Sequence, residues 1–225
     1  MNRRFRIGVT GGIGTGKTYV ANLIHRSFGI PVYNTDAEAK RLMTESPEIR
    51  EQLLSLLGTE VYLPTGQLNR DLMRRFVFSN EKNVKAVNAI VHPAVRRDFL
   101  RWADAVALTT EEAALQQQYF TQQVVAVESA LLVEAQLTED VDSVLLVTAS
   151  LKTRINRTMQ RDGLSEHDVL QRINHQLSDV ERLPFVHYIV TNDDNTTDLA
   201  EQLQRIMHAL TASPINKDSI SSQTI

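Results

Sequence analysis

Short apolar segments alternate with amphipathic segments along most of this chain. The apolar runs have the length and the β-branched content of buried strands, and they predict strands at residues 5–10, 30–34, 123–128, 142–148 and 186–190. Apolar positions at helical spacing predict helices at about residues 17–28, 150–161, 165–177 and 197–210. Strands separated by helices favour parallel pairing, because a parallel connection needs a crossover. The pattern therefore predicts an α/β fold of three layers, αβα, around a mostly parallel five-stranded sheet.

The stretch from Asp36 to about Trp102 is amphipathic and mostly helical, and it is too long for a single crossover helix. We therefore expect a helical insertion that packs beside the sheet. Within it, the pair His92-Pro93 interrupts a helical pattern, and Pro93 is expected in the first turn of a new helix. Two segments carry less pattern: the polar residues 108–123 are expected only to extend a surface helix, and residues 211–225 to form a disordered tail.

The composition of the 225 residues argues against several classes of partner and site. The net charge of −3 provides no basic field, so we expect no nucleic-acid partner. No apolar run approaches the roughly 20 residues of a membrane span, so we expect no membrane association. The chain has no cysteine, which excludes disulfides and thiolate chemistry and favours a cytoplasmic protein. The histidines lack metal-ligand spacing, so we expect no structural metal.

Residues 11–18, GGIGTGKT, match the pattern G-x-x-x-x-G-K-[ST] between a predicted strand and a predicted helix. A loop that wraps a phosphate must turn successive backbone N–H groups inward, and glycine adopts the required backbone angles without strain. The positive end of the following helix adds to the anion site. Lys17 supplies a point charge for the β- and γ-phosphates, and Thr18 supplies a hydroxyl for Mg²⁺. The pattern predicts binding of a nucleoside triphosphate; the alternative is a glycine-rich turn without a ligand.

Two carboxylates lie where predicted strands end. Asp36 follows the second strand, where it could accept a proton from an attacking hydroxyl, as a kinase requires; alternatively, it caps the following helix. Glu128 ends the third strand, where it could approach Mg²⁺ through water or serve as a structural hydrogen-bond acceptor. The residues alone leave both choices open.

A stripe of arginines follows the fourth predicted strand. Arg154, Arg157 and Arg161 are spaced so that they share one face of the predicted helix. Such a stripe can neutralise charge on a transferring phosphoryl group, as a closing lid does. The alternative is a solvated cationic face, and the phosphate loop favours a functional role for one or two of the three.

Seven segments together resemble the dephospho-CoA kinase family, in the family's order over roughly residues 5–210. They are GVTGGIGTGKTYVANL (8–23), YNTDAEAKRL (33–42), GQLNRDLMRRFVFSN (66–80), VNAIVHP (87–93), ESALLVE (128–134), RTMQRDGLS (157–165) and the closing strand with Asn192. The resemblance implies a P-loop kinase fold. Its nucleotide-binding core would comprise residues 1–35, 108–150 and 184–210, its mostly helical substrate (CoA)-binding domain residues 36–107, and its helical lid residues 151–183.

The resemblance also implies a reaction and roles for individual residues. The family uses ATP and Mg²⁺ to phosphorylate the ribose 3′-hydroxyl of dephospho-CoA, with Asp36 as the general base and Lys17 and Arg157 as further catalytic residues. Thr18 would hold Mg²⁺ with ATP, and Asp36, Arg75 and His92 would bind the substrate. The residues implied in ATP binding are Gly12, Ile13, Gly14, Thr15, Gly16, Lys17, Thr18, Tyr19, Arg157, Arg161 and Asn192.

Two departures from the family pattern concern single positions. Many members have D-x-D after the second strand, and here Asn34 takes the first position, so only Asp36 can be the base. Ala130 replaces a proline that many members have before the paired leucines, which affects the expected shape of that loop and not the chemistry.

Two other functions remain open at this point. Another small-molecule or nucleotide kinase would share the phosphate loop, the base and the lid, and would differ in the helical insertion. A non-catalytic ATP-binding switch would bind ATP without phosphorylating an acceptor. The partner that the resemblance implies is dephospho-CoA, and we expect a monomer or a weak homo-oligomer.

Overall fold

The computed structural model describes residues 3–193 and 196–212. The chain forms two compact units: the first contains the residues up to Tyr33 and those from Ala103 onward, and the second is Asn34–Trp102. The predicted tail, residues 211–225, lies outside the described residues except for the first two, which end a helix. None of the helices in the described part of the chain combines the length and the apolar composition that a membrane span requires.

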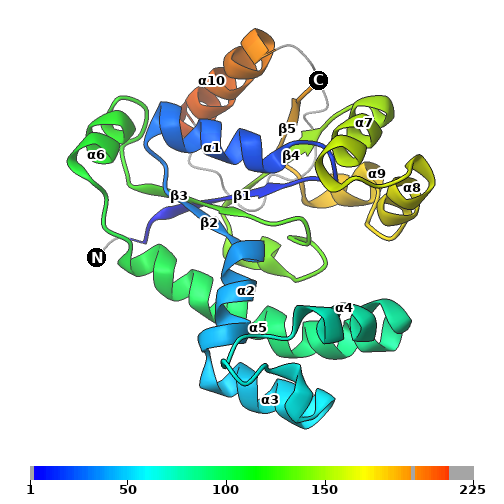
Figure 1. Cartoon of the computed structure of the whole chain (residues 1–225). Helices are drawn as coiled ribbons and strands as arrows, with labels where there is room; N and C mark the ends of the chain where they lie inside the picture. The colour runs from blue at the N-terminus through cyan, green and yellow to red at the C-terminus, as the bar shows by residue number, and fades with distance from the viewer. Residues whose placement is uncertain (1–2, 194–195, 213–225) are drawn as a thin grey trace. The chain divides into compact units, whose positions relative to one another are not determined.

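The first unit is built on a parallel sheet (Figure 1). Its strands lie in the order β2-β3-β1-β4-β5; β1 pairs in parallel with β3 and with β4, and β4 pairs in parallel with β5. The predicted α/β fold with a five-stranded parallel sheet is confirmed. Loops that leave the carboxyl ends of parallel strands meet at one edge of the sheet, where such folds bind their ligands. The strands are β1 (Phe5–Thr10), β2 (Val32–Asn34), β3 (Val124–Glu128), β4 (Ser143–Thr148) and β5 (Tyr188–Thr191).

Helices α1 and α10 pack on one face of this sheet (Figure 1). Their apolar stripes meet alternate residues of β1, β3 and β4, and removing this surface from water drives the packing. The shared core contains Ile7, Val9, Val20, Ile24, Val124, Ala126, Leu145, Val147, Leu199, Leu203 and Met207. The helices of the first unit are α1 (Lys17–Phe28), α6 (Thr110–Gln117), α7 (Leu151–Asp162), α8 (Glu166–Asn174), α9 (Asp179–Arg182) and α10 (Thr196–Ala212), with 3₁₀ helices η2 (Leu137–Asp140) and η3 (Leu183–Phe185).

The segment between β3 and β4 packs against the central strand, β1. Leu132, Leu137 and Val141 of this segment are buried. Leu132 packs directly over Gly8, where a Cβ would lie 2.7 Å from Leu132 Cδ2. The close contact holds the strand that leads into the phosphate loop.

Several element boundaries differ from the prediction because single residues change backbone hydrogen bonding. Strand β2 begins at Val32 and not at residue 30, because Pro31 has no N–H to donate. Helix α8 ends at Asn174, before the predicted residue 177. The chain then starts α9, for which Ser178 and Glu181 form a capping box. By contrast, α1 matches its predicted range.

The second unit is helical. Helix α5 is continuous through Pro93, so the prediction that Pro93 begins a new helix is wrong. A proline removes one N–H donor from a helix, and here the buried side chains of Val91, Ala94 and Val95 keep the helix packed on both sides of it. The elements of this unit are α2 (Thr35–Glu45), α3 (Pro47–Leu57), the 3₁₀ helix η1 (Thr59–Val61), α4 (Arg70–Ser79) and α5 (Glu81–Ala105), whose last residues lie in the first unit.

The polar segment 108–123 does more than extend a surface helix. It contains α6, and the Gln116 side chain in this helix is 3% exposed. Its Nε2 donates to the carbonyls of Gly29 and Val124, each at 2.9 Å, and its Oε1 accepts the N–H of Val124 at 2.9 Å. One glutamine therefore joins α6 to the end of α1 and to the start of β3.

Candidate active site

The phosphate loop joins β1 to α1, and two of its glycines have left-handed backbone. Gly14 and Gly16 have φ angles of 78° and 80°, which residues with a side chain adopt only with strain. Neighbouring segments also leave no space for a side chain. A Cβ would lie 2.4 Å from the Arg154 carbonyl oxygen at Gly14 and 2.2 Å from Asn192 Nδ2 at Gly16. Both the backbone angles and the close packing therefore require glycine here.

Thr15 is the buried centre of this loop. Its Oγ1 donates to the Gly12 carbonyl at 2.9 Å, and its own carbonyl accepts from Asn192 Nδ2 at 2.8 Å. Asn192 directly follows β5 and is 5% exposed. The structure therefore brings Asn192 against the loop, 177 residues away in sequence.

Lys17 and Thr18, in the first turn of α1, lie beside Glu128 at the end of β3. Thr18 Oγ1 donates to Glu128 Oε1 at 3.0 Å, and Lys17 Nζ lies 3.9 Å from the same oxygen. Glu128 is 3% exposed, and a buried carboxylate is stable only with such partners. No side chain caps the N-terminus of α1, and its first turn contains no acidic residue, so its first backbone N–H groups can bind an anion.

Arg157, on α7, binds the two residues that follow β5. Its Nη1 donates to the Asn192 carbonyl at 2.7 Å and its Nη2 to the Asp193 carbonyl at 3.2 Å. The Asp193 carboxylate accepts the N–H of Ser150, the residue that caps α7, at 2.9 Å. This hydrogen bond lowers the pKa of Asp193 below its usual value.

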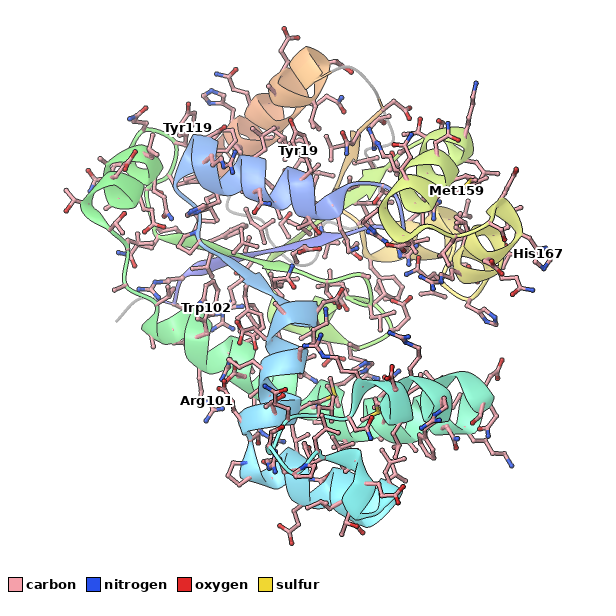
Figure 2. All side chains as sticks on the ribbon, in the orientation of Figure 1. Tyr19, Arg101, Trp102, Tyr119, Met159 and His167 are labelled. Atoms are coloured by element: carbon pink, nitrogen blue, oxygen red, sulfur yellow. The ribbon has the colours of Figure 1, made fainter. Side chains whose placement is uncertain are left out.

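The other two arginines of the predicted stripe have different surroundings. The Arg154 side chain is 11% exposed and donates from Nε to the Ile13 carbonyl at 3.0 Å; burial lowers the pKa of its guanidinium. Arg161 is 62% exposed and forms an ion pair with Asp162 at 2.7 Å. Tyr19, also predicted to bind ATP, is 51% exposed on α1 (Figure 2).

One residue that contacts the loop was not predicted from the sequence. Gln176, in the turn after α8, accepts the N–H of Ile13 on its Oε1 at 2.7 Å. It lies 163 residues from Ile13, and a single glutamine in a polar segment belongs to no motif or period. The sequence therefore carried no signal for it.

Asp36 belongs to the second unit and is an exposed residue in the first turn of α2. The N-cap of this helix is Asn34, whose Oδ1 accepts the N–H of Ala37 at 2.8 Å. The capping interpretation of Asp36 is therefore wrong, because Asn34 performs that role. In this chain, the first position of the D-x-D pattern therefore caps the helix.

The second unit also contains an open pocket of 1020 Å³ between α2, α4 and the segment that precedes α4. Cationic and apolar side chains line it together. The cations are Lys40, Arg70 and Arg74, and the apolar residues include Met43 and Met73. One acid, Asp71, also lines the pocket, with Oδ1 3.9 Å from Arg74 Nη1. The predicted substrate residues Arg75 and His92 lie in the same unit, on α4 and α5.

Known proteins that resemble this chain are dephospho-CoA kinases. The family model for dephospho-CoA kinase matches residues 5–198. The chain is 34% identical over 188 residues to a dephospho-CoA kinase of Bacteroides fragilis, which covers 84% of each protein. It is 37% identical over 167 residues to one of Porphyromonas gingivalis, covering 74% of this chain and 75% of the relative. For one of Vibrio vulnificus the identity is 32% over 197 residues, covering 88% and 91%.

Solved structures resemble the fold. The crystal structure of TT1252 from Thermus thermophilus is 32% identical and has a TM-score of 0.71, covering 93% of this chain and all of that one. Dephospho-CoA kinase from Campylobacter jejuni has a TM-score of 0.60 at 20% identity, covering 92% and 97%. Shikimate kinase from Acinetobacter baumannii in complex with shikimate has a TM-score of 0.53 at 14% identity, covering 93% and 96%. The last two show the fold alone, and the predicted P-loop kinase fold is confirmed.

Proposed function

The chain belongs to the dephospho-CoA kinase family, and we propose that it uses ATP to phosphorylate the ribose 3′-hydroxyl of dephospho-CoA, giving coenzyme A and ADP. The enzyme is a phosphotransferase with an alcohol acceptor. The observation that carries the proposal is the phosphate loop: at the start of α1, Lys17 and Thr18 lie beside the buried Glu128 of β3.

The loop from Gly12 to Thr18 and the positive end of α1 hold the phosphates of ATP. Lys17 contacts the β- and γ-phosphates, and Glu128 keeps its ammonium group and the Thr18 hydroxyl in position. Such fixed donors act without reorganising during the reaction, so positioning and electrostatics contribute most of the rate gain.

The side chains at this point fit Mg²⁺, which prefers oxygen ligands. The Thr18 hydroxyl and the Glu128 carboxylate are 3.0 Å apart, so Thr18 can hold the ion together with ATP and Glu128 can approach it through water. When bound, Mg²⁺ neutralises charge on the β- and γ-phosphate oxygens. The role of the chain is to hold these two oxygen groups at the phosphate loop.

Asp36 is the proposed general base. It accepts the proton of the ribose 3′-hydroxyl while the hydroxyl oxygen bonds to the γ-phosphorus, the bond to the β–γ bridging oxygen breaks, and ADP leaves. The assignment is supported by the carboxylate being exposed and by Asn34 serving as the cap of α2. Arg157 binds ATP and stabilises charge on the transferred group, with Arg161 as a further lid residue.

The pocket in the second unit is the proposed site for the rest of the acceptor. Lys40 follows Asp36 by one helical turn on the same face of α2, about 6 Å along the axis. Arg70 and Arg74 line the same pocket. These cations match the diphosphate of dephospho-CoA in charge, and the apolar lining, including Met43, matches the pantetheine arm.

The proposal also includes the division into domains, the location in the cell and the oligomeric state. Residues 36–107 form the substrate-binding domain, in which Arg75 and His92 also contact dephospho-CoA, and residues 151–183 form the lid. The protein works in the cytoplasm as a monomer or weak homo-oligomer, without a nucleic-acid partner.

Mass spectrometry of a reaction with ATP, Mg²⁺ and dephospho-CoA tests the function, with Asp36→Asn beside the wild type. We expect coenzyme A from the wild type, a kcat about 10²–10⁴-fold lower for the variant, and ATP binding unchanged within about twofold. Glu48→Gln, an exposed acid in the first turn of α3, is the matched control and keeps full activity. A fully active Asp36→Asn protein would show that the base lies elsewhere. A wild type that binds ATP without forming coenzyme A would favour the non-catalytic switch.

The same assay tests the pocket through Arg74→Ala. Loss of one charge-assisted contact should raise KM for dephospho-CoA about tenfold and leave KM for ATP unchanged. An unchanged KM for dephospho-CoA would place the diphosphate outside this pocket.

A further inference from the structure

Both backbone polar groups of Ile13, in the phosphate loop, are bound by side chains from the segment between β4 and β5. Gln176 Oε1 accepts the Ile13 N–H at 2.7 Å, and Arg154 Nε donates to the Ile13 carbonyl at 3.0 Å. The two contacts hold the peptide units on either side of Ile13.

The first of these peptide units is held at both ends. The carbonyl and the N–H of a trans peptide point in opposite directions. The Ile13 N–H donates to Gln176, and the Gly12 carbonyl of the same unit accepts from Thr15 Oγ1 at 2.9 Å. The Ile13 N–H is therefore bound by the protein, and so is the Thr15 N–H, which donates to the same Gly12 carbonyl at 3.3 Å. The anion is left to the N–H groups of Gly14 and of the residues from Gly16 onward.

The second peptide unit is oriented by Arg154. Since Arg154 holds the Ile13 carbonyl, the Gly14 N–H of the same unit must point the opposite way. The approach of Arg154 also requires the missing side chain at Gly12, where a Cβ would lie 2.2 Å from Arg154 Nη2. The arginine thus fixes the direction of the first N–H group that is available for a phosphate.

Arg154 is itself held by a carboxylate that a buried arginine also contacts. Its Nη1 lies 4.0 Å from Asp179 Oδ2. The fully buried Arg182 lies 3.6 Å from Asp179 Oδ1 and 3.6 Å from Glu134 Oε1. A buried guanidinium between carboxylates has little freedom to reorient, so the carboxylate that it shares with Arg154 is fixed as well.

We propose that Gln176 and Arg154 are positioning residues for ATP: together they orient the backbone at Ile13 so that the N–H groups of Gly14 and of the residues from Gly16 onward converge on the β-phosphate. The proposal rests on the proposed ATP site. It separates Arg154 from Arg157, because Arg154 acts on the loop and not on the transferred phosphoryl group. In the opposing view Gln176 competes with a phosphate for the Ile13 N–H, and its removal would then tighten ATP binding.

Calorimetric titration of ATP, ADP and AMP into the Gln176→Met protein tests the proposal. Methionine keeps the length of the side chain and removes the acceptor. We expect Kd for ATP and for ADP to rise about 5–10-fold and Kd for AMP to stay within about twofold, because only the β-phosphate uses the oriented loop. Gln171→Met is the matched control, since Gln171 bonds to His167 on the outer side of α8 (Figure 2) and should leave all three Kd values unchanged.

Arg154→Met adds a second test, which separates positioning from charge stabilisation. If Arg154 is a positioning residue, the Arg154→Met protein should have a higher Kd for ADP and an unchanged Kd for AMP, as we expect for Gln176→Met. A loss of kcat with unchanged ADP binding would instead assign it to the transferred phosphoryl group and overturn the proposal.

The binding data remain decisive whatever the acceptor is. If the wild type forms no coenzyme A, the proposed function fails, while the ATP, ADP and AMP titrations still test the role of the loop. Unchanged or tighter ATP binding by Gln176→Met, or equal weakening of all three nucleotides, would refute positioning by Gln176.

Discussion

Gln116→Leu tests whether a single side chain in a polar segment holds the first unit together. Leucine has a similar volume, so the substitution leaves little cavity and mainly removes hydrogen bonds. It deprives the carbonyl of Gly29 and both the N–H and the carbonyl of Val124 of their bonds to the side chain. The surroundings are buried, with Val124 1% exposed, so water does not readily replace these bonds.

The expected loss follows from those three groups. A buried polar group that loses its partner costs about 1–3 kcal/mol, and the lower half of that range gives about 3–6 kcal/mol for the set. That is a large share of the roughly 5–15 kcal/mol by which domains are stable. At about 2–4 °C per kcal/mol for a chain of this size, the melting temperature should fall by about 6–24 °C.

Urea unfolding and thermal melting measure this loss, and Gln117→Leu is the matched control because Gln117 is the exposed neighbour on α6. Gln116→Glu tests the direction in which stability changes with pH. Its carboxylate would face the carbonyls of Gly29 and Val124, which raises its pKa in the folded state, so its stability relative to the wild type should recover as pH falls. If Gln116→Leu and Gln117→Leu differ by less than about 1 kcal/mol, the hydrogen-bond argument is wrong.

Two further predictions concern the region around β5. Asn192→Ala removes the donor to the buried Thr15 carbonyl and should cost about 2 kcal/mol in urea unfolding and raise KM for ATP several-fold, whereas the exposed Asn156→Ala on α7 should do neither. His187 Nδ1 accepts the Val144 N–H at 3.1 Å, and burial lowers the pKa of His187. Its contribution to stability is therefore complete above the unfolded-state pKa of about 6.5 and is lost as pH falls through the lower folded-state pKa. Melting curves of wild type and His187→Leu should converge in acid; curves that stay parallel would contradict this.

Side-chain period and backbone chemistry made much of the fold predictable. The strand at residues 5–10 and the helix at residues 17–28 have the predicted ranges, because burial on both faces and an apolar stripe are local patterns. The loop between them was predictable for a similar reason, since a motif with glycine, lysine and threonine at fixed spacing specifies a backbone shape. Local reasoning failed at Pro93, where packing on both sides of the residue outweighs one lost hydrogen bond.

The sequence alone predicted Lys17 and Thr18 as site residues and left two roles open for Glu128; the structure adds that the three side chains lie together. For Asp36 the sequence left two roles open. The hydrogen bond from Ala37 to Asn34 removed one of them, because a helix cap is decided by backbone geometry at the helix start and two neighbouring residues can both supply it.

Only the tertiary structure distinguished residues of the same type. Arg154, Arg157 and Arg161 are equivalent in spacing, yet one is buried against the phosphate loop, one binds the exit of β5, and one is exposed beside Asp162. Gln116 and Gln176 carry no sequence signal at all. Periodicity records which face of a helix is buried, but a hydrogen bond to a distant backbone group depends on which segment the fold places across from it, and no local pattern contains that information.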